Sequence, residues 1–288
     1  MILQEKYTLS NGVEIPKIGL GTWEISDATV AQAVKQAVAI GYRHIDTAQG
    51  YFNERGVGEG IRTCGIKREE IFVTTKLDAA IKNYDEAVAA IDGSLKKSGL
   101  DYIDLMIIHS PKPWTEYDKE DRHFEGNRAA WRALEDAYQA GKLRAIGVSN
   151  FEEADIDNIL ASCRVKPMVN QILAHISNTP QKLIQYCRQK GILVGAYSPI
   201  GHGELLKNKE IMAVAEKYNV DVAQLGIRYC LQLELLPLPK TANPQHMQSN
   251  AAVDFVISDK DMELLINIEQ IKDYGEASRF PVFGGKSK

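Results

Sequence analysis

Short apolar segments alternate with longer amphipathic segments along this chain, and this alternation limits the possible folds more than any other feature. Each apolar segment has the length of a β-strand, and the longer segments carry apolar residues at the spacing of one helix face. Nearly continuous apolar strands are typical of a parallel sheet that is covered on its outer face. Eight such strands are expected, at 17–21, 44–48, 71–77, 104–109, 143–150, 167–172, 192–198 and 235–240.

Eight strand–helix units predict a (β/α)₈ TIM barrel of the α/β class. The chain has 288 residues and no linker rich in Gly, Ser or Pro, so we expect one domain over 1–288. A long loop at 110–124 separates the fourth strand from its helix. The other helices are expected from about 26, and at 57–63, 85–98, 152–162, 180–190, 209–218, 222–233, 244–251 and 259–268.

Two short alternating runs flank Asn11-Gly12 within residues 7–15, before the repeating units begin. Asn-Gly between such runs is a strong signal for a two-residue hairpin turn. We therefore expect an N-terminal β-hairpin that caps one end of the barrel.

Composition excludes several classes of partner. A net charge of −4 and a pI near 5.9 argue against nucleic acid and anionic membranes as partners. The N-terminus has no long apolar run, so neither a signal peptide nor a membrane span is expected. The cysteines lack metal-type spacing, which indicates reduced thiols in a cytoplasmic protein and no metal site; they are Cys64, Cys163, Cys187 and Cys230.

Polar residues gather where the expected strands end. The carboxyl ends of barrel strands form one mouth, where active sites of such barrels lie. Asp46 ends the second strand and Tyr51 follows it, Lys76 lies on the third and His109 ends the fourth. Later strands end in Ser149, Asn150, Asn170, Gln171, Tyr197, Ser198, Lys240 and Thr241.

The segment 41–54 alone allows two interpretations. Asp46 could cap a loop while Tyr51 fills a gap in the core, or both could take part in catalysis. A lysine ammonium within about 4 Å would lower the pKa of a phenol from its usual value of about 10. Lys76 would thus make Tyr51 a usable acid, while Asp46 holds Lys76 and His109 donates a hydrogen bond to a substrate oxygen. A bound carbonyl would then gain a proton on oxygen as a hydride reaches its carbon.

Hydride transfer requires a cofactor, because no side chain can donate a hydride. Tyr197 offers an aromatic face, and Ser149, Asn150 and Gln171 could bond a carboxamide. Lys240-Thr241 precedes a helix start at Pro244, which suits a phosphate group. No Gly-x-Gly-x-x-Gly follows an early strand, so a dinucleotide is expected to lie extended across the mouth.

The chain resembles the aldo-keto reductases over essentially its whole length. Gly41-Tyr-Arg-His-Ile-Asp-Thr-Ala, Tyr51-x-Asn-Glu54 and Val57-Gly58 match the first signature of that family. Gly141-Lys-Leu-Arg-Ala-Ile-Gly-Val-Ser-Asn-Phe151 matches the second and Leu238-Pro-Lys-Thr241 the third. The resemblance implies reduction of aldehydes or ketones with NADPH, with a catalytic tetrad at Asp46, Tyr51, Lys76 and His109.

The resemblance also implies where the cofactor and a small-molecule carbonyl substrate bind. Substrate contacts would come from Tyr51, His109, Trp23, Trp114 and residues 279–283. An alternative for the tryptophans and the tail is ordinary anchoring of surface loops. Cofactor contacts would come from Gly21, Thr22, Asp46, Ser149, Asn150, Gln171, Tyr197, Ser198, Ile200, Gly201, Leu205, Lys240, Thr241, His246 and Asn250.

Two residues depart from the pattern that the family implies. His246 stands where the family usually has an Arg that clamps the 2′-phosphate, and Ser249 replaces a common Glu near the adenine. Histidine is mostly neutral at pH 7, whereas Arg is a permanent bidentate partner for phosphate. We therefore expect a weaker preference for NADPH over NADH, so that NADH is accepted as well. We expect a monomer.

Two other functions stay open at this point. A Schiff-base aldolase also places a lysine at the end of a barrel strand, but this route needs Lys76 neutral, which Asp46 opposes. A non-catalytic barrel could bind a dinucleotide as a sensor or subunit.

Overall fold

Eight parallel strands close into a barrel in a computed structural model, which describes residues 1–285. Neighbouring strands pair in chain order, and the ring closes where Gly21 bridges Lys240 and where the Gly19 and Gly21 amides donate to the carbonyls of Pro237 and Pro239. The predicted α/β barrel is confirmed; the last three residues of the predicted domain, 286–288, lie outside the described residues. The strands are β3 (Leu20–Gly21), β4 (His44–Asp46), β5 (Phe72–Leu77), β6 (Ile103–Ile108), β7 (Leu143–Ser149), β8 (Val169–Leu173), β9 (Leu193–Tyr197) and β10 (Leu236–Leu238).

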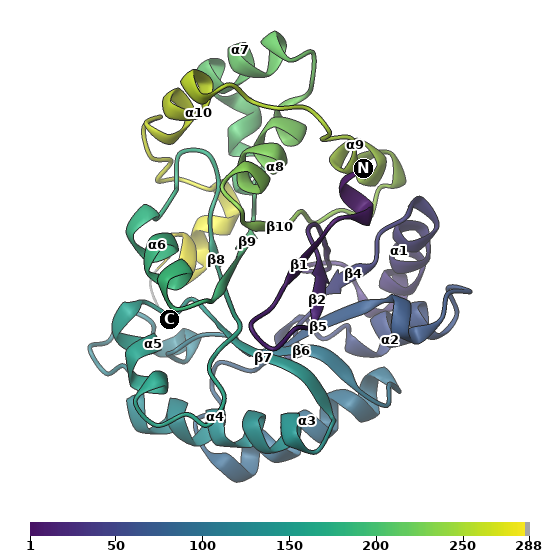
Figure 1. Cartoon of the computed structure of the whole chain (residues 1–288), viewed down its shortest axis with the longest axis vertical. Helices are drawn as coiled ribbons and strands as arrows, with labels where there is room; N and C mark the ends of the chain where they lie inside the picture. Colours follow the sequence, from purple (N-terminus) through teal and green to yellow (C-terminus); the bar gives the residue numbers. More distant parts are fainter. Residues whose placement is uncertain (286–288) are drawn as a thin grey trace.

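Helices surround the strands on the outside of the barrel (Figure 1). Their apolar faces pack on the barrel, so that Val34 of the first helix and Trp131 of the fourth are almost completely buried. The helices are α1 (Asp27–Ile40), α2 (Glu54–Arg62), α3 (Tyr84–Ser98), α4 (Phe124–Gln139), α5 (Glu153–Leu160), α6 (Gln181–Gln189), α7 (Lys209–Lys217), α8 (Val222–Gln232), α9 (Pro244–Ala251) and α10 (Asp259–Ile266).

Some element boundaries differ from the predicted ones. The first strand pairs only over Leu20–Gly21, and the last only over Leu236–Leu238. Pro237 and Pro239 carry no N–H, so where the ring closes they offer only their carbonyls to the first strand. Helix α2 begins three residues before the predicted start. A 3₁₀ helix with a kink, η5 (Gly201–Lys207), follows β9.

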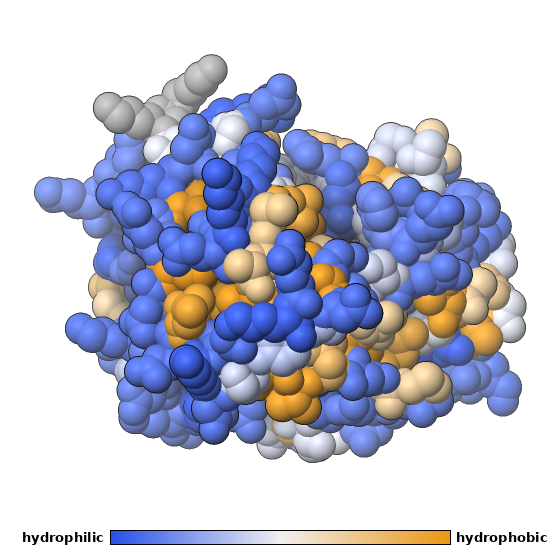
Figure 2. Space-filling model, turned by 90° about the horizontal axis from the view of Figure 1, so that it is seen from above, coloured by the Kyte–Doolittle hydropathy of each residue, from blue (hydrophilic) through white to orange (hydrophobic). Residues whose placement is uncertain are grey.

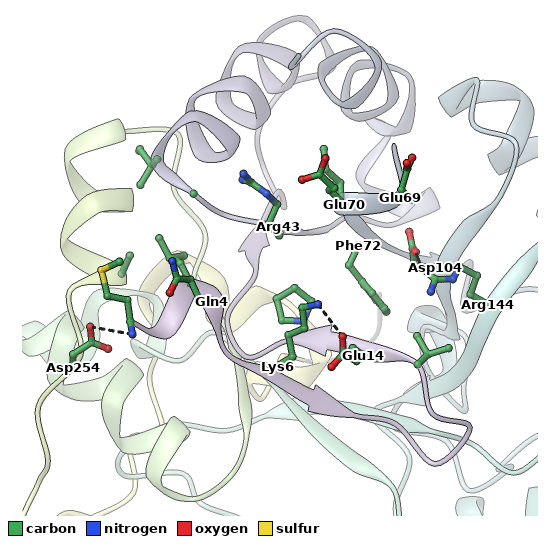
Figure 3. A pocket seen from close by; sticks show the side chains of 18 of the residues that line it. Gln4, Lys6, Glu14, Arg43, Glu69, Glu70, Phe72, Asp104, Arg144 and Asp254 are labelled. Atoms are coloured by element: carbon green, nitrogen blue, oxygen red, sulfur yellow. Dashed lines mark hydrogen bonds and ion pairs between the residues drawn. The ribbon is translucent and has the colours of Figure 1, made fainter. Parts of the chain in front are cut away.

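The predicted hairpin lies across the amino-terminal end of the barrel (Figure 1). β1 (Lys6–Thr8) and β2 (Glu14–Pro16) pair antiparallel with Tyr7 opposite Ile15, whose side chain is buried in the core. A cavity of about 1220 Å³ opens beside the hairpin, and charged side chains line it (Figure 3). It lies at the opposite end of the barrel from the predicted mouth.

The outer surface is mixed in character. Figure 2 shows the face of α7 and α10, where groups of apolar residues are separated by hydrophilic ones. Scattered apolar residues of this kind are normal on a protein surface. Within residues 1–285, no helix combines the length and the apolar character needed to cross a membrane.

Candidate active site

A cavity of about 680 Å³ lies at the carboxyl ends of the strands, as the sequence predicts. It is formed by loops that follow the strands and by the C-terminal tail, which includes η7 (Pro281–Phe283). The predicted site residues that line it are Gly21, Thr22, Trp23, Asp46, Tyr51, His109, Trp114, Ser149, Asn150, Gln171, Tyr197, Ser198, Ile200 and Lys240.

Asp46 and Lys76 form a buried ion pair directly below this cavity. Their side chains are 5% and 1% exposed, and the ammonium of Lys76 donates to Oδ1 of Asp46 and to the carbonyl of Thr47 at 2.9 Å. The other oxygen of Asp46 accepts from Nε2 of Gln171 at 2.8 Å. Burial alone would lower the pKa of Lys76, but the charge of Asp46 and the hydrogen bonds with Asp46 and Tyr51 raise it above its ordinary value. Lys76 therefore keeps its charge at neutral pH.

Tyr51 lies at the end of a short 3₁₀ helix, η2 (Gln49–Tyr51), above this pair. The Lys76 ammonium is 4.8 Å from the centre of its ring. Burial raises the pKa of Tyr51, and the charge and hydrogen bond of Lys76 oppose this rise without cancelling it. Lys76 acts on this pKa in the expected direction, but desolvation of the phenolate is the larger effect, so the net shift is upward. Tyr51 thus carries its proton at neutral pH, next to a cation that stabilises the phenolate.

His109 lies between Tyr51 and Trp114, with ring centres 5.7 and 5.1 Å away. Burial and the charge of Lys76 lower the pKa of His109 well below its ordinary value, so the imidazole is neutral. Within residues 1–285, its Nδ1 atom has no hydrogen-bond partner. A neutral imidazole still carries one N–H that it can offer to a bound oxygen.

A hydrogen-bonded group of polar side chains forms another part of the wall. The hydroxyl of Tyr197 donates to Asn150 Oδ1 at 2.7 Å, and Nδ2 of Asn150 donates to Ser149 Oγ at 3.1 Å and to the His109 carbonyl at 3.0 Å. Ser149 Oγ donates in turn to the carbonyl of Gln171 at 2.8 Å. An aromatic face beside amide and hydroxyl groups fits a flat ring that bears a carboxamide.

Several predicted cofactor residues do not line this cavity. Leu205 is fully buried in the core, and Gly201 is buried as well, although the next residues, His202 and Gly203, line the cavity. The residues expected at the adenosine end extend away from the mouth. Lys240 lines the cavity, Thr241 lies between it and α9, and His246 and Asn250 lie on α9.

Sequence reasoning missed some residues of the wall. Phe52, Asp78, Glu24 and His202 all line the cavity. For two of them, the place in the sequence could have indicated a position at the mouth, because Phe52 directly follows Tyr51 and Asp78 directly follows the end of β5. The tail residues 280–283 line the cavity as well, and Phe280 packs against Trp23 with ring centres 5.1 Å apart.

Comparison with known proteins agrees with this geometry. A model of the Aldo/keto reductase family matches residues 17–270. The chain belongs to the aldo/keto reductase family. It is thus an oxidoreductase that reduces carbonyl compounds with NAD(P)H, and the resemblance inferred from the motifs is confirmed.

Characterised relatives and solved structures match nearly the whole of this aldo/keto reductase. Glyoxal reductase of Bacillus subtilis is 41% identical over 91% of each chain. The crystal structure of an aldo-keto reductase from a Medee basin deep-sea metagenome library superposes with a TM-score of 0.86 at 36% identity, covering 93% of this chain and 96% of the other. A Bombyx mori aldo-keto reductase in complex with NADP has a TM-score of 0.84 at 34% identity, covering 95% of each chain.

Proposed function

We propose that this enzyme reduces an aldehyde or ketone to an alcohol with NADPH, and that Tyr51 donates the proton. The observation that carries the proposal is the convergence of Tyr51, His109 and the buried Asp46–Lys76 pair at one cavity.

The four side chains divide the work on a bound carbonyl. His109 donates a hydrogen bond to the carbonyl oxygen and holds it beside the Tyr51 hydroxyl. Tyr51 passes its proton to that oxygen as negative charge develops there. Lys76 stabilises the phenolate left behind, an interaction of about 4 kcal/mol at about 4 Å and an effective dielectric of about 20. Asp46 keeps Lys76 charged and in place.

The residues present fit a nicotinamide cofactor, which supplies the hydride when bound. Tyr197, Ser149, Asn150 and Gln171 would hold the nicotinamide half, helped by Asp46 and Ser198. Gly21, Thr22 and the segment from Ile200 to Leu205 would shape the path of the pyrophosphate. Lys240, Thr241, His246 and Asn250 would hold the adenosine end, and Lys240 favours the 2′-phosphate of NADPH.

His246 limits the preference for NADPH in this proposal, and its substitution tests the phosphate role. His246→Arg adds a bidentate, permanently charged partner for the 2′-phosphate. We expect KM for NADPH to fall about tenfold while KM for NADH stays unchanged. Equal changes for both cofactors would remove residue 246 from the phosphate site.

The Schiff-base aldolase needs a neutral lysine as nucleophile. The raised pKa of Lys76 argues against this role, since the amine stays protonated beside Asp46. Borohydride trapping with a carbonyl substrate tests this alternative, and stable attachment at Lys76 would favour the aldolase.

The deciding experiment is Tyr51→Phe, assayed with a generic aldehyde and NADPH. We expect turnover to fall about a thousandfold, because the proton donor is lost. Binding of NADPH, followed by fluorescence titration, should remain. Tyr117→Phe is the matched control, since Tyr117 stacks on Trp114 near the same mouth at 5.8 Å. Wild-type turnover in Tyr51→Phe would overturn the assignment of Tyr51 as the proton donor, whereas no turnover in the wild type itself would favour a non-catalytic dinucleotide-binding barrel.

A further inference from the structure

Phe52 is an unusual residue at the rim of the active-site cavity. Its side chain is 87% exposed although it directly follows Tyr51. Its backbone adopts φ 56° and ψ 27°, in the left-handed region that bulky side chains rarely occupy. Both the exposure and the backbone conformation disfavour a phenylalanine here. Conformations of this kind cluster at active sites, where the surrounding structure enforces them.

The residues around Phe52 fix this conformation. Gln49 donates from Nε2 to the carbonyl of Ala90 at 3.0 Å and to Ser94 Oγ at 2.9 Å, while its Oε1 accepts from the Asp78 amide. On the other side, Asn53 is buried and its Nδ2 donates to the carbonyls of Thr22 and Ile25 at 2.9 Å. The turn is therefore held at both ends, and the ring of Phe52 stays at the rim.

Aromatic side chains from other loops lie around the same cavity. Trp114, after β6, stacks on Tyr117 and meets the edge of His109. Trp23, after β3, packs against Phe280 of the tail. Together with Phe52 they give the cavity apolar, flat surfaces on several sides.

The charges of the wall disfavour an anionic substrate. Of the described residues that line the cavity, Lys240 is the only permanently cationic side chain, and it belongs to the cofactor end. Asp78 and Glu24 line the same cavity; Glu24 pairs with Arg279 at 3.7 Å, whereas Asp78 lies close to Gly50, two residues before Phe52. A carboxylate or phosphate next to Phe52 would meet like charge rather than a partner.

We propose that Phe52 is a specificity-determining residue, which covers a flat, neutral, apolar substituent of the carbonyl substrate. The inference rests on the proposed function and names its substrate class as aryl aldehydes and ketones without an acidic group. When the carbonyl binds at Tyr51 and His109, the substituent extends to the rim and contacts the Phe52 ring. This contact removes from water the apolar surface that the free enzyme exposes.

The test is Phe52→Asn, because Asn tolerates the left-handed backbone and removes only the ring. We expect kcat/KM for 2-naphthaldehyde to fall about tenfold, through KM rather than kcat. The value for propanal, which is too small to reach the rim, should stay within about twofold. Phe52→Tyr keeps the ring and should retain wild-type values for both aldehydes. Val256→Asn is a matched control that removes a side chain 69% exposed from a site away from the cavity.

Substrate charge gives a second readout on the wild-type enzyme. We expect 4-methylbenzaldehyde to be reduced with about tenfold higher kcat/KM than 4-carboxybenzaldehyde, and Phe52→Asn to reduce this ratio. Equal loss for naphthaldehyde and propanal in Phe52→Asn would show that Phe52 only supports the Tyr51 turn and would overturn the proposal. Unchanged values for both aldehydes would also overturn it. Failure of the wild type to reduce any aldehyde would instead reject the proposed function.

Discussion

Each end of this barrel carries a cavity, and the larger cavity is the weaker candidate for an active site. The cavity beside the hairpin measures about 1220 Å³ and the one at the mouth about 680 Å³. Charged residues beside the hairpin are largely solvated, as in the pair of Lys6 and Glu14, whose side chains are 50% and 59% exposed. At the mouth, Asp46 and Lys76 are almost fully removed from water. Burial, rather than volume, makes a charge strong enough to shift the pKa values of its neighbours.

A second contrast concerns how completely buried carboxylates are satisfied. Asp104 lies at the hairpin end and is fully buried, and it accepts from Arg68 and Arg144 at 2.6 Å and from the Val73 amide at 2.9 Å. These partners are part of the framework. At the mouth, the partner of Asp46 is a lysine that also touches a tyrosine facing the cavity. The charge of Lys76 at the mouth can therefore act on a substrate, whereas the charge of Asp104 at the hairpin end is balanced by residues of the framework.

Substituting one cation at each end gives the largest expected difference. Lys76→Met should lower kcat about a thousandfold and leave NADPH affinity within a few-fold, because the phenolate of Tyr51 loses its counter-charge. Arg144→Met should lower the free energy of unfolding by about 2 kcal/mol, since Asp104 loses one charged hydrogen bond. Its kcat per folded molecule should stay at the wild-type value. Single-turnover assays and urea unfolding measure the two effects.

Folding has to be checked in the same pair, because Lys76→Met leaves Asp46 without its buried cation and lowers stability by about 3 to 5 kcal/mol. Assays below the melting temperature of both variants, with NADPH present, keep the comparison valid. A similar loss of kcat in Arg144→Met would show that any buried ion pair supports activity. That result would remove the distinction between the two ends.

Buried histidines at the two ends should behave alike in stability and differently in catalysis. Burial lowers the pKa of His44, at the start of β4, to about 3, and that of His109 well below its usual value. An unfolded histidine gains a proton below about pH 6.5, while these folded ones do not. The unfolded state then binds more protons, so the free energy of unfolding falls as the pH drops below 6.5. Each histidine contributes about 1.4 kcal/mol per pH unit.

The measurement is urea unfolding between pH 4.5 and 7.5 for the wild type, His44→Gln and His109→Gln. Each variant should reduce the acid slope by one proton, and only His109→Gln should also impair reduction. An unchanged slope in His44→Gln would mean that this histidine is already protonated in the folded barrel.

Much of the fold could be predicted because each strand–helix unit has its own local pattern of apolar residues in the sequence. Where pairing depends on closure of the ring, prediction was less accurate. β3 is reduced to Leu20–Gly21 and β10 to Leu236–Leu238, and at the closure Pro237 and Pro239 can only accept hydrogen bonds from the first strand. Convergence of Asp46 and Lys76 followed from the barrel alone, because parallel strand ends meet at one mouth.

The rest of the site depends on distances between loops, which no local pattern encodes. The direction in which Lys76 acts on the pKa of Tyr51 follows from the pair of residues, but the net pKa is raised because burial is the larger effect. Exposure of Phe52 and the contact of Phe280 with Trp23 likewise depend on segments far apart in the chain.

The smallest expected effect lies at the hairpin. Glu14→Gln removes the exposed pair with Lys6, whose atoms are 2.8 Å apart. Exposed pairs of this kind contribute less than about 0.5 kcal/mol, so the urea midpoint should hardly move and kcat/KM should stay at the wild-type value. Added salt should not change the urea midpoint of the wild type more than that of the variant. A severalfold change in kcat/KM would contradict this, because it would mean that the cavity beside the hairpin acts on the mouth through the barrel. In that case the contrast between a buried charge that faces a cavity and one that is balanced by its framework would no longer explain why chemistry belongs to one end.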